Sequence, residues 1–229
     1  MNIYFLVEGK RTEMKVYPKW LSYLVPQLTK VQWHHQVNAN NYCIFTGNGF
    51  PCLLDNHLRN SVEDINDAAN FDYFVICLDA DEQSTQQCKQ DILDFMTKEN
   101  IFLNNNVQFE IIVQNKCFET WFLGNPKIFK QNPSDDFLNE CVKFYNVKSK
   151  DPELMKKISD FEGSTSDFHF KYLNLLLSER NIKYTKKNPQ GVVEKYYLED
   201  LIKRNKNTRH IESFKTFLDF CDKINSKIQ

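Results

Sequence analysis

Two short, densely apolar segments each run directly into acidic residues, and this pattern constrains the fold of the chain most strongly. Ile3–Val7 precede the tripeptide EGK that begins at Glu8, and Tyr73–Leu78 precede the tetrapeptide DADE that begins at Asp79. Such runs are typical of strands that are buried on both faces, as in a parallel sheet covered by helices. Open α/β sheets bind ligands at the carboxyl edge, where parallel neighbours would bring these acids together. Crowded carboxylates repel one another unless a divalent cation lies among them, and Mg²⁺ or Mn²⁺ suits such ligands.

The composition predicts a folded protein in a reducing compartment. The chain has 229 residues, of which 41% are hydrophobic, and this is enough for one large domain or for one domain with an appendage. No apolar run approaches the roughly 20 residues that span a bilayer, and no basic segment precedes the first apolar run. The seven cysteines are odd in number and form no CxxC pair, which argues against a disulfide framework or a zinc ribbon. We therefore expect a cytoplasmic protein.

Charge is distributed unevenly along a chain whose net charge is only −1. Between Asp55 and Asp94 there are ten acidic and two basic residues. Between Lys171 and Arg209 there are ten basic and four acidic residues, so this stretch could contact a polyanion. An ordinary solvated helical surface explains the same charges equally well.

Strand-like and helix-like segments alternate over the first half of the chain. This order predicts an α/β fold, a three-layer sandwich with a mostly parallel sheet, followed by a mainly helical C-terminal region. We expect a domain at 1–126 and a helical region at 127–229 packed on it. The predicted strands are Met1–Val7, one or two strands within Gln32–Thr46, Asp72–Leu78 and Val107–Val113. The predicted helices are Arg11–Leu28, with a kink or break at Pro18, and Leu53–Ala69, Ser84–Glu99, Phe118–Leu123, Asp135–Tyr145, Pro152–Phe161, Phe168–Glu179, Val193–Arg204 and Ile211–Ile228.

The segment that begins at Glu8 is the first candidate for chemistry. Gly9 permits a sharp turn and a close approach of phosphate to the backbone. The helix that follows would present free N–H groups to an anion, Lys10 would add positive charge, and Thr12 could cap the helix. A simpler interpretation is that Glu8 is only a favourable acid near a helix N-terminus.

Asp79 and Asp81 form the second candidate, a DxD motif that leaves a strand. Alternate residues of an extended segment point to the same side, so both carboxylates could reach one cation. Alternatively, Asp81 or Ser84 merely caps the next helix, for which Ser84 and Gln87 have the spacing of a capping box.

The third candidate follows the last predicted strand. Glu119 could join the same sheet edge as a ligand or position one, and Lys116 could neutralise a phosphate. Glu119 could equally be an acid at a helix N-terminus. His34, His35 and His169 do not adjoin a strand-end acid, and we interpret them as surface or core residues rather than metal ligands.

Taken together, these segments resemble the TOPRIM fold of topoisomerases, primases, RecR-type proteins and OLD-type nucleases. The fuller set is most similar to small bacterial TOPRIM-like proteins of the RloB-like kind. The resemblance covers roughly Met1–Leu123 by motif. It rests on VEGKRTE at Val7–Glu13, LDADE at Leu78–Glu82 and NKCFETWFL at Asn115–Leu123, with HIESFKTFLDF at His210–Phe220 similar to the closing helix.

The resemblance implies roles for particular residues. It makes Glu8 the TOPRIM glutamate and Asp79 and Asp81 the metal-binding aspartates, while Lys10 and Glu119 match recurring positions of the smaller group. The chain has no ATPase module, no topoisomerase cleavage domain and no evident primase zinc module. Nuclease activity or a role beside a partner protein remains, and similar proteins are expected in phage defence or restriction-modification settings.

We therefore predict a Mg²⁺- or Mn²⁺-dependent nuclease that hydrolyses phosphodiester bonds in DNA or RNA. Asp79 and Asp81 would hold the metal with Glu8, which is a third ligand or the base for the attacking water. Lys10, Lys116 and Glu119 would complete the catalytic set. The helical region would contact the nucleic acid, mainly at its phosphates, and no membrane contact is expected.

Two other classes of function remain open. The chain could be a partner-gated or non-catalytic subunit of a defence complex, activated by an ATPase or a restriction-modification subunit. It could also be a phospho-receiver signalling domain, which gathers strand-end acids in a similar way and would use Lys116 as its strand-end lysine.

Overall fold

The protein divides into two compact units in the computed structural model, which describes residues 1–228. The first unit comprises residues 1–78, 84–113 and 216–228, and the second comprises residues 79–83 and 114–215. These units group residues by their mutual contacts, so the domain boundary expected after residue 126 stays a prediction.

The first unit contains a parallel five-stranded sheet with the strand order β2-β3-β1-β4-β5. In the pairing of β1 with β3, Asn2 lies opposite Asn41, and in its pairing with β4, Val7 lies opposite Cys77. The strands are β1 (Asn2–Val7), β2 (Thr29–Lys30), β3 (Asn41–Thr46), β4 (Tyr73–Asp79) and β5 (Gln108–Gln114). The chain thus goes from β1 to β3 on one side and then crosses to β4 on the other, so the strand order reverses between β1 and β4.

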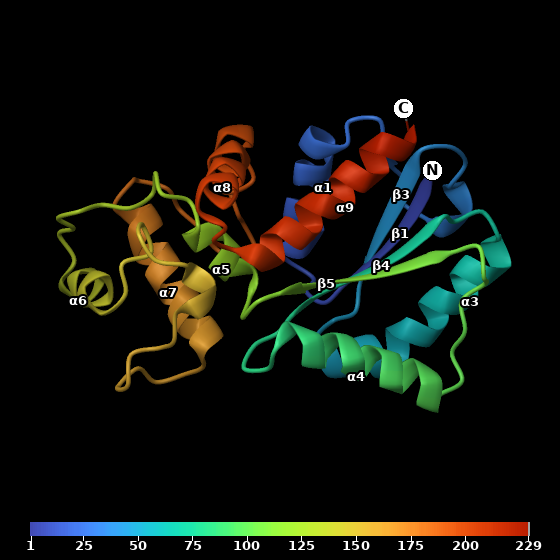
Figure 1. Ribbon diagram of the computed structural model, residues 1–229, viewed down its shortest axis with the longest axis horizontal. Coiled ribbons are helices and arrows are strands. Elements are labelled where there is room, and N and C mark those ends of the chain that lie inside the picture. The colour runs from blue at the N-terminus through green and yellow to red at the C-terminus, as the bar shows by residue number, and fades with distance from the viewer. Residues whose placement is uncertain (229) are drawn as a thin grey trace. The chain divides into compact units, whose positions relative to one another are not determined.

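Helices cover both faces of this sheet (Figure 1). In the first unit they are α1 (Glu13–Leu24), α2 (Phe50–Cys52), the π-helical turn η2 (Leu53–Leu58), α3 (Arg59–Ala68), α4 (Thr85–Lys98) and most of α9 (Glu212–Ile228), together with the 3-10 turn η1 (His34–Gln36). Figure 1 shows α1 and α9 on one face and α3 and α4 on the other. This three-layer arrangement is the α/β sandwich that the sequence predicts.

Neighbouring side chains of β1 pack against opposite layers. The Tyr4 hydroxyl donates to the Asp64 carboxylate of α3 at 3.2 Å, whereas the Phe5 ring meets the Phe220 ring of α9 edge-on at 6.1 Å. All six β1 residues are buried. The strand therefore anchors both layers, which explains why its sequence is a nearly continuous apolar run.

Three local expectations differ from the structure of the first unit. Pro18 does not divide the first helix, because α1 runs unbroken through it, although α1 ends at Leu24 rather than at Leu28. Thr12 already has helical backbone angles and makes no side-chain cap hydrogen bond, so it does not cap α1. The predicted helix at Leu53–Ala69 begins earlier, at Phe50, and its first turns include a π-helical turn.

The second unit is mainly helical, as the sequence predicts. Its elements are α5 (Phe118–Leu123), α6 (Asp136–Phe144), the 3-10 turn η3 (Pro152–Leu154), α7 (Thr165–Ser178), α8 (Lys195–Thr208) and the first residues of α9. The expected helix at Pro152–Phe161 is wrong, because only η3 is helical there. The Asp151 carboxylate accepts a hydrogen bond from the Glu153 amide at 3.1 Å, and this contact caps the short turn.

Candidate functional site

Glu8 stands at the carboxyl end of β1, and backbone hydrogen bonds fix its main chain within the first unit. Its amide donates to the Cys77 carbonyl of β4 at 2.9 Å, and its carbonyl accepts from the Gly49 amide at 3.0 Å. Its side chain is half-buried. Glu8 therefore continues the pairing of β1 with β4, next to the point where the strand order reverses.

Glu13 is a second carboxylate near the end of β1, and the sequence-based prediction did not include it. A Cβ atom at Gly9 would lie 2.1 Å from the Glu13 Oε1 atom, so this carboxylate packs directly over the Gly9 backbone. Burial and, to a smaller extent, the Glu13 charge raise the pKa of the Cys77 thiol to about 12. The signal available in the sequence was the second acid of the VEGKRTE segment.

Lys10 and Arg11 are exposed in the turn between Glu8 and α1. Both side chains are therefore accessible to an anionic ligand. The catalytic role expected for Lys10 stays a prediction.

In the second unit, two turns that follow strands are joined by backbone hydrogen bonds. The Ala80 amide donates to the Gln114 carbonyl at 2.9 Å, and the Asp81 amide donates to the Lys116 carbonyl at 2.8 Å. Asp81 and Lys116 both have left-handed backbone angles, with φ of 47° and 73°. Non-glycine residues adopt this conformation at an energetic cost, so the paired turns hold the DxD segment and Lys116 in a defined arrangement.

Asp81 and its neighbour Glu82 contact the start of α7. Asp81 Oδ1 accepts a hydrogen bond from the Ser166 hydroxyl at 2.7 Å, and Glu82 Oε1 accepts one from the Thr165 amide at 3.0 Å. The bond from Thr165 holds the pKa of Glu82 below its usual value. Asp81 thus has a structural contact in addition to its predicted role as a metal ligand. The alternative that Ser84 caps the following helix is confirmed, because its hydroxyl accepts from the Gln87 amide at 3.1 Å.

The charges of Asp79 and Glu119 both raise the pKa of one buried thiol in the second unit, that of Cys117. Burial raises the pKa of Cys117 well above its ordinary value, and the charges of Glu119 and Asp79 raise it further. Glu119 is only 2% exposed, and its Oε1 accepts a hydrogen bond from the Tyr184 hydroxyl at 2.8 Å. The structure therefore brings these two predicted site residues to the same neighbourhood, where Cys117 stays a neutral thiol.

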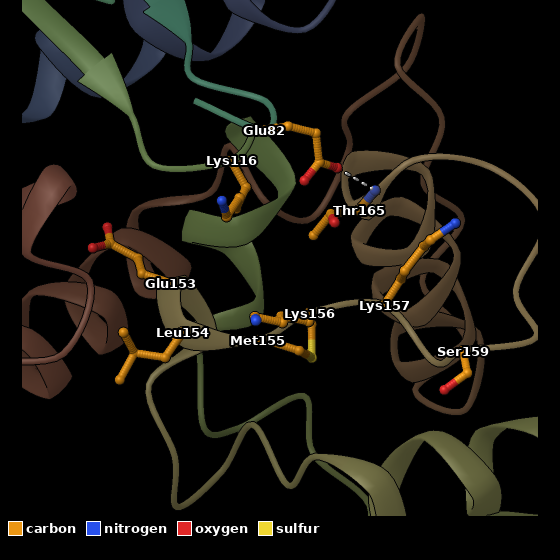
Figure 2. A pocket seen from close by; sticks show the side chains of 9 residues that line it. All are labelled: Glu82, Lys116, Glu153, Leu154, Met155, Lys156, Lys157, Ser159 and Thr165. Carbon is orange, nitrogen blue, oxygen red and sulfur yellow. Dashed lines mark hydrogen bonds between the residues drawn. The ribbon is translucent and has the colours of Figure 1, made fainter. Parts of the chain in front are cut away.

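A pocket of about 570 Å³ lies in the second unit beside Lys116 (Figure 2). Two glutamates and three lysines line it, and the other lining residues are Leu154, Met155, Ser159 and Thr165. The charged residues are Glu82, Lys116, Glu153, Lys156 and Lys157. The sequence singled out Lys116 as a candidate and placed Glu82 in the acidic DADE segment. It did not point to Glu153, Lys156 or Lys157, because they belong to the segment Pro152–Phe161, which was expected to be an ordinary helix.

Glu153 is a buried acid in this pocket. Its Oε1 accepts hydrogen bonds from the Ser213 backbone amide at 3.0 Å and from the Ser213 hydroxyl, and its Oε2 accepts one from the Asn115 side-chain Nδ2 at 3.5 Å. Burial raises the pKa of Glu153 to about 6, against the lowering effect of the Ser213 hydrogen bonds. Glu153 is therefore mostly charged at neutral pH.

His169 is a core residue, as expected. Its Nδ1 lies 2.8 Å from the Thr120 hydroxyl and its Nε2 lies 3.1 Å from the Met155 carbonyl. Burial lowers the pKa of His169 to about 4. The neutral ring thus donates from Nε2 and accepts at Nδ1, and both nitrogens serve the fold.

Comparisons with known proteins identify no relative of this chain: no family model, no curated protein and no solved structure matches it. Among residues 1–228, no group of three or more His, Cys, Asp or Glu side chains is arranged to hold a metal ion. Within the same residues, no helix is long and apolar enough to span a membrane.

Proposed function

We propose that the protein is a metal-dependent nuclease that hydrolyses phosphodiester bonds in DNA or RNA. The observation that carries this proposal is the reversal of strand order between β1 and β4, because open α/β sheets bind ligands at such a point. Glu8 follows Val7 directly, and Asp79 comes two residues after the Val7 partner Cys77. Two neighbouring strands of a parallel sheet thus lead into acidic residues at the favoured edge.

The donor chemistry suits Mg²⁺ or Mn²⁺. Asp79, Asp81 and Glu8 offer carboxylate oxygens, which are the ligands that these cations prefer. We propose that these three carboxylates hold the cation, which would have to draw them together on binding, because no three such side chains among residues 1–228 are already arranged as a metal site. When bound, it would supply stabilisation of the negative charge that develops on the phosphate and a lower pKa for water.

The remaining residues have supporting roles in this proposal. Glu8, if it is not a ligand, accepts a proton from the attacking water. Lys10 and Lys116 place positive charge near the scissile phosphate. Glu119, buried beneath Tyr184, positions the acidic turn rather than contacting substrate. We further propose a cytoplasmic role in bacterial defence or restriction-modification, beside an ATPase or another partner subunit.

Nucleic-acid cleavage by purified protein tests the proposal. The protein is incubated with single-stranded DNA, duplex DNA and RNA in the presence of Mg²⁺, Mn²⁺ or EDTA. We expect cleavage that needs the metal and that falls at least about 100-fold in Glu8→Gln and Asp79→Asn, because each change removes a charged oxygen donor. The matched controls are Glu63→Gln and Asp136→Asn, which alter exposed acids and should retain full activity.

Equal cleavage by the wild type and both site variants would mean a contaminating nuclease and would overturn the proposal. Absence of cleavage together with retained Mn²⁺ binding would instead favour the partner-gated subunit.

A further inference from the structure

The two carboxylates of the pocket in the second unit already accept hydrogen bonds from neighbouring protein groups. Glu82 accepts a hydrogen bond from the Thr165 backbone amide (Figure 2), and Glu153 accepts hydrogen bonds from the Ser213 amide and hydroxyl. These donors hold both carboxylates in place, and within residues 1–228 neither carboxylate forms an ion pair closer than 4 Å with a lysine of the pocket. The acids still present oxygen acceptors at the pocket wall.

The three lysines of the pocket outnumber its two carboxylates, although the charge of Glu82 attracts Lys116 and Lys157. Lys157 donates to the carbonyls of Phe161 and Gly163 at 3.2 and 2.6 Å, so its ammonium is held by neutral acceptors. Within residues 1–228, neither Lys116 nor Lys156 forms an ion pair closer than 4 Å. Two ammonium groups are therefore available to an anion, the ligand that such groups bind best.

The pocket also offers apolar surface and more space than a single phosphate needs. Its volume of about 570 Å³ falls in the range that accommodates small organic ligands. Leu154 is 72% exposed at its rim, and Met155 lines it beside the buried His169. A ligand that combines an anion, hydrogen-bond donors and a flat apolar group would use all of these features.

We propose that this pocket binds a nucleoside monophosphate group, either as a free nucleotide or as the 5′-phosphorylated end of a strand. The phosphate contacts the ammonium groups of Lys116 and Lys156. Glu82 and Glu153 accept hydrogen bonds from sugar hydroxyl or base amino groups, and the base lies against Leu154. The site is a binding site and goes beyond the proposed hydrolase, because it needs neither a metal nor cleavage.

Binding in EDTA tests this site without any contribution from catalysis. The probes are AMP, adenosine, and a 3′-fluorescent tetrathymidylate with either a 5′-phosphate or a 5′-hydroxyl. Calorimetry measures the nucleosides, and fluorescence anisotropy measures the strands. The variants are Lys156→Gln, Lys116→Gln and Lys156→Arg, and the control is Lys143→Gln, which alters an exposed lysine at the end of α6. Circular dichroism and thermal melting confirm that each variant is folded.

We expect phosphate-dependent binding that weakens about tenfold in Lys156→Gln and in Lys116→Gln, because each change removes one charge-assisted contact. Lys156→Arg should retain most of the affinity, and Lys143→Gln should match the wild type. Tight binding of AMP identifies a free nucleotide as the ligand, and binding of the phosphorylated strand alone identifies a strand end.

The proposal would be overturned if the phosphate made no difference to affinity, either between AMP and adenosine when both bind or between the two strands. Equal affinity of Lys156→Gln and the wild type for the phosphorylated probes would overturn it too. The absence of binding to all four probes at millimolar concentration would overturn it as well. Lys116 belongs to both proposals, so Lys156→Gln, which alters a residue outside the proposed catalytic set, separates nucleotide binding from cleavage. Loss of cleavage in the Glu8 and Asp79 variants does not bear on nucleotide binding in EDTA.

Discussion

At the scale of single residues, burial shifts the pKa values of two side chains in the second unit, and the two shifts have opposite effects on how stability depends on pH. It raises the pKa of Glu153 to about 6 and lowers the pKa of His169 to about 4. Each shift favours the neutral form of its group. Acid therefore favours the folded state at Glu153 and disfavours it at His169.

The Glu153→Gln variant tests the first of these effects. Glu153 has a pKa of about 6 when folded, against 4.5 ordinarily, so the folded state binds the proton more tightly. Its contribution to stability is present below pH 4.5 and is lost as the pH rises through 6. We expect the wild type to lose about 2 kcal/mol relative to Glu153→Gln between pH 4.5 and pH 7. Urea unfolding across this range measures the difference, and a difference that does not vary with pH would contradict the assignment.

At the scale of elements, one serine at the start of α9 connects several parts of the second unit. The Ser213 hydroxyl accepts from the Trp121 indole nitrogen of α5 at 2.7 Å and from the Asn115 amide at 3.0 Å, while it donates to Glu153 of η3. All of these contacts are within the second unit. The Ser213 side chain thus links the start of α9 to α5, to η3 and to the turn at Asn115.

Ser213→Ala should be strongly destabilising because it leaves buried partners without their hydrogen bonds. We expect a loss of about 2–3 kcal/mol in the free energy of unfolding. Ser226→Ala, which changes an exposed serine in the same helix, should cost less than about 0.5 kcal/mol. Denaturant titration of both variants measures these losses. Equal stability of Ser213→Ala and Ser226→Ala would contradict the structural role assigned to Ser213.

Two glycines of the first unit provide a matched comparison. A Cβ atom at Gly9 would meet the flexible end of Glu13, whereas one at Gly47 would lie 2.5 Å from Leu53 Cβ and 2.9 Å from its Cα. Gly9→Ala should therefore displace a carboxylate with little loss of stability but lower the proposed cleavage activity. Gly47→Ala should cost about 1–3 kcal/mol through overpacking. Thermal unfolding and cleavage assays separate the two effects, and a larger loss of stability in Gly9→Ala would contradict this account.

The strands and most helices could be predicted because local patterns determine them. The apolar run of β1 and the helix at Phe118–Leu123 are both where the sequence indicated. In place of the expected helix at Pro152–Phe161, the chain makes contacts with distant residues: Glu153 accepts from Ser213, 60 positions away, and the Met155 carbonyl lies 3.1 Å from Nε2 of His169. Glu153 was missed as a pocket acid because its partner is so far away in the sequence. Single-sequence patterns contain no information about such distant partners.

At the scale of the whole molecule, the parallel sheet pairs two strands that are far apart in the sequence and that both lead into acidic residues. The residues that follow β1 and β4 are separated by about 70 positions in the chain, yet the two strands are paired from Ile3 with Tyr73 to Val7 with Cys77. The apolar runs predicted two buried strands of a mostly parallel sheet, and the structure shows that these two strands are direct neighbours. The metal itself, the substrate and the defence context stay predictions.

Titration of Mn²⁺ into the purified protein tests the central claim most directly. Electron paramagnetic resonance counts free Mn²⁺ for the wild type, Glu8→Gln, Asp79→Asn and the exposed-acid control Glu63→Gln. The account predicts saturable binding by the wild type and the control, and binding at least about tenfold weaker in the two site variants, since each loses one anionic ligand. Undiminished binding in both site variants, or no saturable binding by the wild type, would contradict it.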